Sequence, residues 1–294
     1  MQVVIYSKVL HLEDIPHVQI LFDALHTEGV NTYIYEPYFE QIKDKIVFKR
    51  DVAVVQSYLD FRTHAFDYVI TLGGDGTILD AVTVVRDSDV PIMGINLGRL
   101  GFLASISKKR IEEAVKMLIN GQFTVEWRGL LHLESNLPVF GDVRFALNDF
   151  TILKRDTSSM ITIHTYLNGA YLNSYWADGL IVATPTGSTG YSLSCGGPIV
   201  FPNSGNFIIT PVAPHNLNVR PVVVSDRSVI SFEIEGRADN FLCTLDSRFA
   251  VVNADFQLAV RRADFNIKLI QLHGDTYLKT IREKLLWGAD ARNH

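Results

Sequence analysis

Cysteine is scarce in this chain, and long apolar runs are missing. Only 2 of the 294 residues are cysteine, which excludes a disulfide framework, and no CxxC spacing suggests a zinc site. We therefore expect two reduced thiols, as in a cytoplasmic protein. No apolar run approaches the roughly 20 residues that span a bilayer, and the N-terminal residues lack the features of a signal peptide. These absences predict a soluble, cytoplasmic protein that has no membrane partner.

An excess of positive charge is also missing. Lys and Arg number 27 against 32 Asp and Glu, so the formal net charge is −5. This balance argues against a nucleic-acid partner, which would need a basic face, but it leaves small phosphorylated ligands open. With 47% hydrophobic and 20% charged residues, the composition is typical of a folded globular protein. Two nucleotide-binding motifs are absent as well: there is no GxxxxGKS/T loop, and no GxGxxG opens the first strand–helix unit.

Strand-like and helix-like segments alternate in the N-terminal part of the chain. Continuous apolar runs predict strands at 2–6, 31–35, 66–72 and 90–95. Helical spacing appears at 15–26 and directly after Thr77, and again between Ser107, a predicted N-cap, and Gly121, a predicted stop. This alternation predicts a mostly parallel sheet with crossover helices.

Beyond residue 122 the pattern changes. Short runs rich in β-branched and aromatic residues are separated by turn residues such as Asn168 and Gly169. The clearest runs lie at 160–167, 180–184, 207–212, 228–234 and 256–260. The sequence therefore predicts an α/β domain over 1–122, completed by a C-terminal tail from about 272 to 294. A β-rich, antiparallel, sandwich-like domain is expected over 123–271.

A glycine-rich turn, GGDGT at residues 73–77, follows the predicted buried strand at 66–72 and opens a helix. Ligands bind at this end of the strands in open α/β sheets. The free amides of Gly73, Gly74, Gly76 and Thr77 suit phosphate oxygens, and the helix N-terminus favours negative charge. The carboxylate of Asp75 is out of place in a simple phosphate cradle. It indicates a role with metal, ribose or a hydroxyl proton, or else an ordinary helix cap.

Two further segments carry polar groups at strand ends. After the strand at 90–95, Asn96 and Arg99 are candidates for contact with donor phosphates, although glycine-rich turns are common for backbone reasons alone. The run at 178–194, DGLIVATPTGSTGYSLS, delivers many hydroxyls interleaved with glycine and ends beside Tyr191. Such groups suit the polar edges and the base of a nucleotide.

These motifs together resemble the NAD kinase family. GGDGT at 73–77, GINLGRLGFL at 94–103, the Asn148-Asp149 pair and the run at 178–198 match in order and spacing. GGDGT alone is shared with diacylglycerol and sphingosine kinases, whereas the hydroxyl-rich run selects NAD kinases. The resemblance covers nearly the whole chain, with the first 60 residues less distinctive.

The resemblance implies that the protein transfers the terminal phosphoryl group of ATP, or of another donor, to the 2′-hydroxyl of the adenosine ribose of NAD, forming NADP. Asp75 would be the general base facing that hydroxyl, with Gly76 beside it. Asn148 and Asp149 would bind ribose hydroxyls and adenine edges. The remaining residues implied to line the dinucleotide pocket are Asp178, Thr186, Thr189, Gly190, Tyr191, Ser192, Leu193 and Ser194. Family members are usually dimers or tetramers, so a homo-oligomer is expected.

Three positions depart from the family pattern. Asp149 stands where Glu is more common, and Gly190 replaces the alanine of TGSTAY. Trp176 stands where many relatives carry a polar or basic residue, which puts the selectivity between NAD and NADH in doubt.

Phosphoryl transfer needs charge compensation on the transferring oxygens. Because the glycine loop contains no lysine, we expect Mg²⁺, without a direct protein ligand, and arginines such as Arg99 or Arg220 to supply it. The alternatives are a lipid or sugar kinase that shares GGDGT, an NAD-binding sensor without catalysis, and, less favoured, a dehydrogenase.

Overall fold

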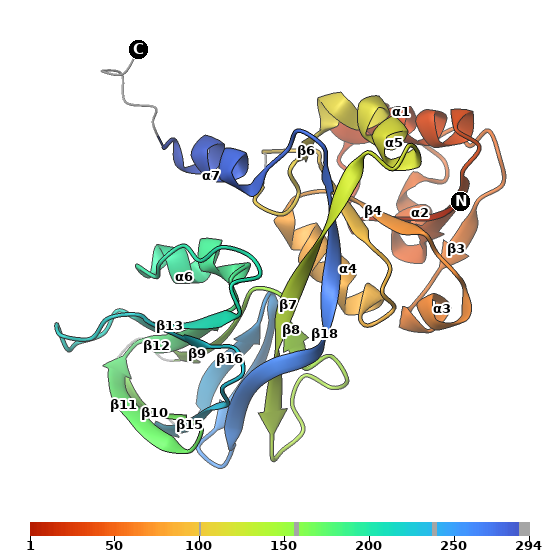
Figure 1. Ribbon diagram of the computed structural model, residues 1–294. Helices are drawn as coiled ribbons and strands as arrows, with labels where there is room; N and C mark the ends of the chain where they lie inside the picture. The colour runs from red at the N-terminus through yellow and green to blue at the C-terminus, as the bar shows by residue number, and fades with distance from the viewer. Residues whose placement is uncertain (100, 156–158, 237–239, 288–294) are drawn as a thin grey trace. The chain divides into compact units, whose positions relative to one another are not determined.

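A computed structural model describes residues 1–99, 101–155, 159–236 and 240–287. The chain folds into two compact units, the first made of residues 1–127 and those from 267 on, the second of 128–266. It passes into the second unit within β7 (Phe123–Ser135) and returns within β18 (Leu258–Leu272) (Figure 1). The domain limits expected from the sequence, at 122/123 and about 271/272, stay a prediction. Leu100 and residues 288–294 of the predicted tail lie outside the described residues.

The first unit contains a parallel sheet in the order β5-β4-β1-β2-β3. Its elements are β1 (Gln2–Tyr6), η1 (Leu12–Asp14), α1 (Ile15–Thr27), β2 (Asn31–Tyr35), α2 (Glu36–Ile42), β3 (Ala53–Val55), α3 (Tyr58–Thr63), β4 (Tyr68–Leu72), α4 (Asp75–Val85), β5 (Ile92–Asn96), β6 (Ile106–Ser107), η2 (Lys108–Arg110), α5 (Ile111–Ile119) and α7 (Tyr277–Leu285). Helix α1 buries Val18, Leu21 and Leu25 on one face. This face packs beside α5 in the core of the unit (Figure 1).

The second unit is built of antiparallel strands. One sheet has the order β14-β13-β12-β9-β16-β17, and β11, β10, β15 and the start of β18 pair in another. Its elements are β8 (Phe145–Ala146), β9 (Asp149–Lys154), β10 (Ile161–Leu167), β11 (Ala170–Ala177), β12 (Gly179–Ala183), η3 (Gly187–Thr189), α6 (Tyr191–Ser194), β13 (Asn206–Val212), β14 (Val222–Ser225), β15 (Ile230–Glu235), β16 (Asn240–Leu245) and β17 (Arg248–Asn253). Alternate residues of both sheets share one buried core, which includes Phe150, Tyr175 and Phe207.

The fold class predicted from the sequence is confirmed: a mainly parallel α/β unit and an antiparallel β-rich unit. Ser107 is an N-cap, as predicted: its Oγ accepts a hydrogen bond from the Lys109 amide (3.4 Å), and the short helix η2 that it starts leads directly into α5. The polar run after β12 contains short helical segments, η3 and α6.

Candidate functional site

The glycine turn of the first unit joins β4 to α4. Gly73 has φ +146°, and a Cβ at this position would lie 2.2 Å from the Thr77 hydroxyl oxygen. Only glycine fits this turn, so the chain can change direction at once and begin α4 at Asp75. Asp75 therefore lies in the first turn of a helix, where the helix dipole stabilises its negative charge.

The Asp75 side chain does not cap its own helix. Its Oδ2 accepts a hydrogen bond from the Phe102 amide (2.8 Å), and its Oδ1 accepts two, from Leu103 (3.0 Å) and Ala104 (2.9 Å). We call this arrangement of three consecutive amides on one carboxylate an amide clasp. The helix-cap interpretation is thus wrong. A carboxylate has about four lone-pair sites, so the clasp leaves one on Oδ2 for a further donor.

Close approach of the backbone makes the first clasp possible. A Cβ on Gly101 would lie 1.8 Å from Oδ1 of Asp75, far inside contact distance. The turn closes with a hydrogen bond from the Gly101 amide to the Ala104 carbonyl (3.2 Å). Glycine at 101 is therefore a condition for holding Asp75 in this position.

The residues predicted to contact donor phosphates take different positions. Asn96 is buried, and its side chain accepts a hydrogen bond from the Gly98 amide (2.8 Å) and donates one to the Ala104 carbonyl (3.5 Å). The Asn96 side chain shapes the turn, because both of its hydrogen bonds stay within the turn. Its predicted contact with a donor phosphate stays a prediction. Gly74, Gly76 and Arg99 are exposed. Gly73 and Thr77 are half-buried.

In the second unit, Asn148 and Asp149 stand where the chain enters β9. Asp149 is 7% exposed. Burial, and then the nearby negative charge of Asp246, raise the pKa of Asp149 to about 7. Within the described residues no hydrogen bond of the structure engages the carboxyl of Asp149, so it remains available to a ligand.

The hydroxyl-rich run comes against this pair after β12. A Cβ on Gly187 would lie 2.0 Å from the carbonyl oxygen of Asn148, so the two backbones touch there. The Cβ position of Gly190 lies 3.7 Å from Nδ2 of Asn148 and 3.8 Å from Oδ2 of Asp149. The structure thus brings together Asn148, Asp149 and Gly190.

Several hydroxyls of the run point inward. Ser192 is fully buried, and its hydroxyl shares a hydrogen bond with that of Thr210 (2.9 Å). Thr186 is also buried, and the Thr189 hydroxyl donates to its carbonyl (3.2 Å). The Ser192 hydroxyl thus supports the run from inside, and its expected ligand contact stays a prediction. Tyr191 and Ser194 are exposed and Leu193 is half-buried, and their expected ligand contacts stay predictions.

Asp178 is engaged by a neighbour. Its Oδ1 lies 2.5 Å from Nζ of Lys154, the last residue of β9. Nearby, the exposed ring of Trp176 lies 4.4 Å from that of His215, measured between centroids. The Arg220 guanidinium donates to the carbonyls of Leu217 (2.6 Å) and Val219 (2.8 Å). It fixes its own loop, which weakens its candidacy for donor phosphates.

Sequence reasoning missed Asp246 and Thr184. Asp246 lies in the turn between β16 and β17, where acidic residues are common for backbone reasons. Thr184 lies inside the quoted run but received no role. Their partners lie about 100 and 40 residues away in the chain, so no local pattern could have identified them.

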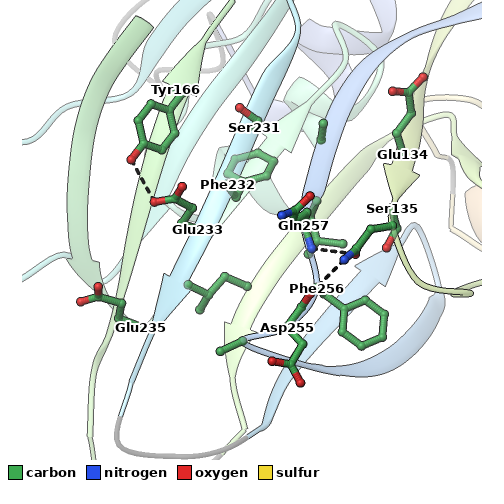
Figure 2. A pocket seen from close by; sticks show the side chains of 15 residues that line it. Glu134, Ser135, Tyr166, Ser231, Phe232, Glu233, Glu235, Asp255, Phe256 and Gln257 are labelled. Carbon is green, nitrogen blue, oxygen red and sulfur yellow. Dashed lines mark hydrogen bonds between the residues drawn. The ribbon is translucent and has the colours of Figure 1, made fainter. Parts of the chain in front are cut away.

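A cavity of about 800 Å³ lies elsewhere in the second unit. It opens where β15 separates from β18, and Figure 2 shows the Tyr166 hydroxyl donating to Glu233 at its wall (2.9 Å). None of its lining residues belongs to the predicted site. Size alone therefore does not identify the functional centre.

The described residues contain neither a cluster of metal-binding side chains nor a membrane-spanning helix. No three His, Cys, Asp or Glu side chains there gather into an arrangement that would hold a metal ion. Both oxygens of Asp75 are already bonded to amides, so the glycine turn does not offer a protein cage for Mg²⁺. Among the same residues, none of the helices has the length and apolar character needed to cross a membrane.

Comparisons with known proteins agree with this geometry. Residues 18–123 match the model of the ATP-NAD kinase N-terminal domain, and residues 147–272 match that of the ATP-NAD kinase C-terminal domain. The chain is 48% identical to the NAD kinase of Cytophaga hutchinsonii over 282 residues, 96% of each protein. It is 44% identical to that of Flavobacterium johnsoniae over 297 residues, all of both proteins.

Solved structures with the same fold are also kinases. The yeast NADH kinase complexed with NADH has a TM-score of 0.86 at 23% identity, covering 98% of this chain and 88% of the yeast chain. An NAD kinase from Archaeoglobus fulgidus in complex with ATP has a TM-score of 0.73 at 25% identity and 97% coverage of both chains.

The matches define the protein first as a kinase, and so as a phosphotransferase. More narrowly, the chain belongs to the NAD kinase family. This membership favours the NAD kinase interpretation over a lipid kinase, a sugar kinase or a dehydrogenase.

Proposed function

We propose that the protein phosphorylates the 2′-hydroxyl of the adenosine ribose of NAD, with ATP as donor, and releases NADP. The observation that carries this proposal is the Asp75 carboxylate, which three amides hold in one orientation while one lone-pair site on Oδ2 stays open. A ribose hydroxyl is a poor nucleophile until its proton has an acceptor. Asp75 is the general base that takes this proton as the oxygen attacks the terminal phosphorus of the donor.

Binding of the dinucleotide falls to the second unit. Asn148 and Asp149 bind ribose hydroxyls or base edges through side chains that no described neighbour engages by hydrogen bonds. The exposed ring of Tyr191 offers a face for a base. Gly190 supports this assignment because its missing side chain leaves room beside both Asn148 and Asp149.

We expect the reaction to depend on Mg²⁺ that is bound to the phosphates of the donor. Mg²⁺ commonly binds through substrate phosphates and few protein groups, which agrees with a glycine turn whose single carboxylate is occupied by amides. The metal, when bound to the triphosphate, supplies charge compensation. The exposed Arg99 is the arginine best available for a phosphate contact.

One assay tests the reaction. Purified protein is incubated with NAD, ATP and Mg²⁺, and NADP is measured by a coupled dehydrogenase. NADP should form, and chelation of the metal should abolish it. The same protein is tested with diacylglycerol, fructose 6-phosphate or NADH as the acceptor. Other triphosphates and polyphosphate are tested as the donor. Phosphorylation of the lipid or sugar without any NADP would overturn the proposal, and NAD binding without turnover would favour a sensor.

Assembly and location are proposed alongside the reaction. We expect a homodimer or homotetramer in the cytoplasm. Light scattering should give a mass at least twice the 33.0 kDa of the chain, and cell fractionation should recover the protein with the cytoplasmic markers. A monomer with full activity at all concentrations would refute the first expectation.

A further inference from the structure

The backbone of residues 147–149 has every polar group engaged. The three amides donate to the Asp246 carboxylate: Leu147 to Oδ2 (2.9 Å), and Asn148 (2.8 Å) and Asp149 (3.2 Å) to Oδ1. This is a second amide clasp. Because buried backbone groups need partners, the clasp fixes the conformation of all three residues.

The carbonyl groups of the same residues are held too. Thr184 donates to the Leu147 carbonyl through its hydroxyl (2.5 Å) and to the Asn148 carbonyl through its amide (2.8 Å). The Asp246 amide donates to the Asp149 carbonyl (3.0 Å). Two residues from distant parts of the second unit thus satisfy all six backbone groups.

The turn that carries Asp246 is itself held in place. Asp246 has φ +53°, a left-handed conformation that aspartate tolerates better than most residues. Two residues on, the Arg248 guanidinium donates to the carbonyls of Val143 and Phe145. The turn is therefore bonded to residues 143–149 in two ways. Asp246 accepts hydrogen bonds from that segment and Arg248 donates hydrogen bonds to it, so the segment and the turn are held together.

The side chains of Asn148 and Asp149, on the backbone held by the clasp, are available to bind a ligand. Both Asn148 and Asp149 lie within 4 Å of the Cβ position of Gly190. Neither side chain makes a hydrogen bond to the part of the chain that the structure describes. A segment with a locked backbone and two unengaged polar side chains is what a preorganised binding site requires.

We propose that Asp246 and Thr184 are positioning residues of the dinucleotide site, which hold the backbone of residues 147–149 so that the Asn148 and Asp149 side chains meet the ligand. This inference rests on the proposed function, since it takes Asn148 and Asp149 as the residues that bind NAD. Neither Asp246 nor Thr184 touches the ligand in this arrangement.

The charge of Asp246 has a separate effect on Asp149. Three amides point at the Asp246 carboxylate, and these hydrogen bonds favour its ionised form. Burial raises the pKa of Asp246, but these amides and Arg248 oppose the rise. The proton of the pair therefore belongs to Asp149. The other titratable groups that face Asp149 are Tyr191 and Cys195 of the α6 region.

The effect of the Asp246 charge on the pKa of Asp149 can be measured as the pH dependence of NAD affinity. A purely structural role of Asp246 would not shift this pH dependence. If ligand hydroxyls donate to ionised Asp149, the ionised fraction rises from about one-eleventh at pH 6 to about ten-elevenths at pH 8, and NAD affinity rises about tenfold. In Asp246→Asn the neighbouring charge is gone, so the pKa of Asp149 falls and the midpoint of the affinity profile moves to lower pH.

The experiment is calorimetric titration of NAD into full-length variants from pH 5.5 to 8.5. Asp246→Asn should lower affinity at pH 8 about tenfold or more, with the midpoint shifted to lower pH. Thr184→Val, which removes one donor and no charge, should lower affinity without moving the midpoint, and Thr184→Ser should restore it. Wild-type affinity and midpoint in Asp246→Asn would overturn the inference.

Two outcomes keep the inference separate from the proposed function. Should Asp246→Asn fail to fold, equal NAD affinity in Thr184→Val and Thr184→Ser would still overturn the positioning role. Should the wild-type protein not bind NAD at all, the proposed function fails. The coupling is then tested by carbon-13 NMR titration of the Asp149 carboxyl, whose unchanged pKa in Asp246→Asn would overturn it.

Discussion

Both units of this protein use an amide clasp, but they use it for opposite purposes. In the first unit, Asp75 receives the amides of residues 102–104. In the second, Asp246 receives those of residues 147–149. Asp75 is the clasped acid and the proposed catalytic group. Asp246 is a clasped acid that carries no proposed chemistry, because the proposed ligand groups sit on the backbone that it holds.

The two clasps show that the same hydrogen bonds can either hold an acid in place or hold a backbone segment in place. A half-buried carboxylate with one open lone-pair site is held still by its amides and remains able to accept a proton. The Asp246 carboxylate instead fixes three residues of a neighbouring segment and places its charge beside Asp149. The same hydrogen-bond pattern therefore positions an acid in one unit and a ligand-binding segment in the other.

The largest expected effect follows replacement of the clasped acid in the first unit. Asp75→Asn removes the proton acceptor and sets an amide N–H₂ against the donors that now face a carboxylate. Turnover should fall about 10²–10⁴-fold, the usual contribution of a positioned base. NAD affinity measured by calorimetry should change little, since the proposed ligand residues lie in the second unit.

Asp80→Asn is the matched control for this variant. Asp80 lies in the same helix and pairs with Lys8 at the surface (2.8 Å), and such pairs contribute little to stability. Turnover of Asp80→Asn should stay near that of the wild type. Near-normal turnover of Asp75→Asn would show that Asp75 shapes the turn and takes no part in proton transfer.

A smaller loss is expected when the acid is kept but the first clasp is disturbed. Gly101→Ala places a methyl group 1.8 Å from the present position of Oδ1, so the carboxylate must move. Loss of one charged hydrogen bond costs about 1.5–3 kcal/mol, which predicts a fall in turnover of about 10–100-fold. Gly98→Ala, whose new Cβ meets only Asn96 at 3.8 Å, should leave turnover unchanged. Equal rates for the two variants would contradict the requirement for the clasp.

Removing the ligand-binding acid of the second unit should affect binding and leave the fold intact. Asp149→Ala deletes a carboxyl that no described neighbour engages by a hydrogen bond, so NAD affinity should fall about tenfold or more without a fall in the melting temperature. The exposed Asp142, replaced by Ala, serves as control. A large loss of stability with unchanged affinity would instead make Asp149 structural.

A pH dependence of stability should follow from Asp149 in the second unit. Asp149 keeps its proton in the folded state up to about pH 7, whereas the unfolded chain loses it near 3.8. This contribution is fully present below pH 3.8 and is lost as pH rises through about 7. Urea denaturation should show that the wild type loses at most about 1.4 kcal/mol per pH unit in this window relative to Asp149→Asn. Parallel profiles of the two proteins would contradict the raised pKa.

The sequence predicted the elements well wherever local periodicity decided them. β1 (Gln2–Tyr6) and β2 (Asn31–Tyr35) have the predicted limits, and α1 differs from its predicted end by one residue. Continuous apolar runs suffice for buried parallel strands. The two clasps could not be predicted from the sequence, because each joins residues far apart in the chain. Nothing in the sequence near Asp75 indicates that the amides of residues 102–104 will bond to it.

Side-chain direction was the second limit of prediction. The hydroxyls of the run at 186–194 suggested a uniform polar surface, yet Ser192 turns inward to Thr210 while Tyr191 and Ser194 stay outside. Such alternation follows from the helical geometry of η3 and α6. A string of small polar residues with glycines carries no periodicity from which this geometry could be predicted.

The shared environment of Asp149 and Asp246 also has a consequence for the heat of binding. If NAD is bound by ionised Asp149, then at pH 6 most molecules must give up a proton to the solution as they bind. The buffer takes up that proton and adds its own enthalpy of ionisation. The apparent binding enthalpy should therefore differ between phosphate and Tris at pH 6 and converge at pH 8.5. The slope against buffer enthalpy counts the protons released for each NAD bound.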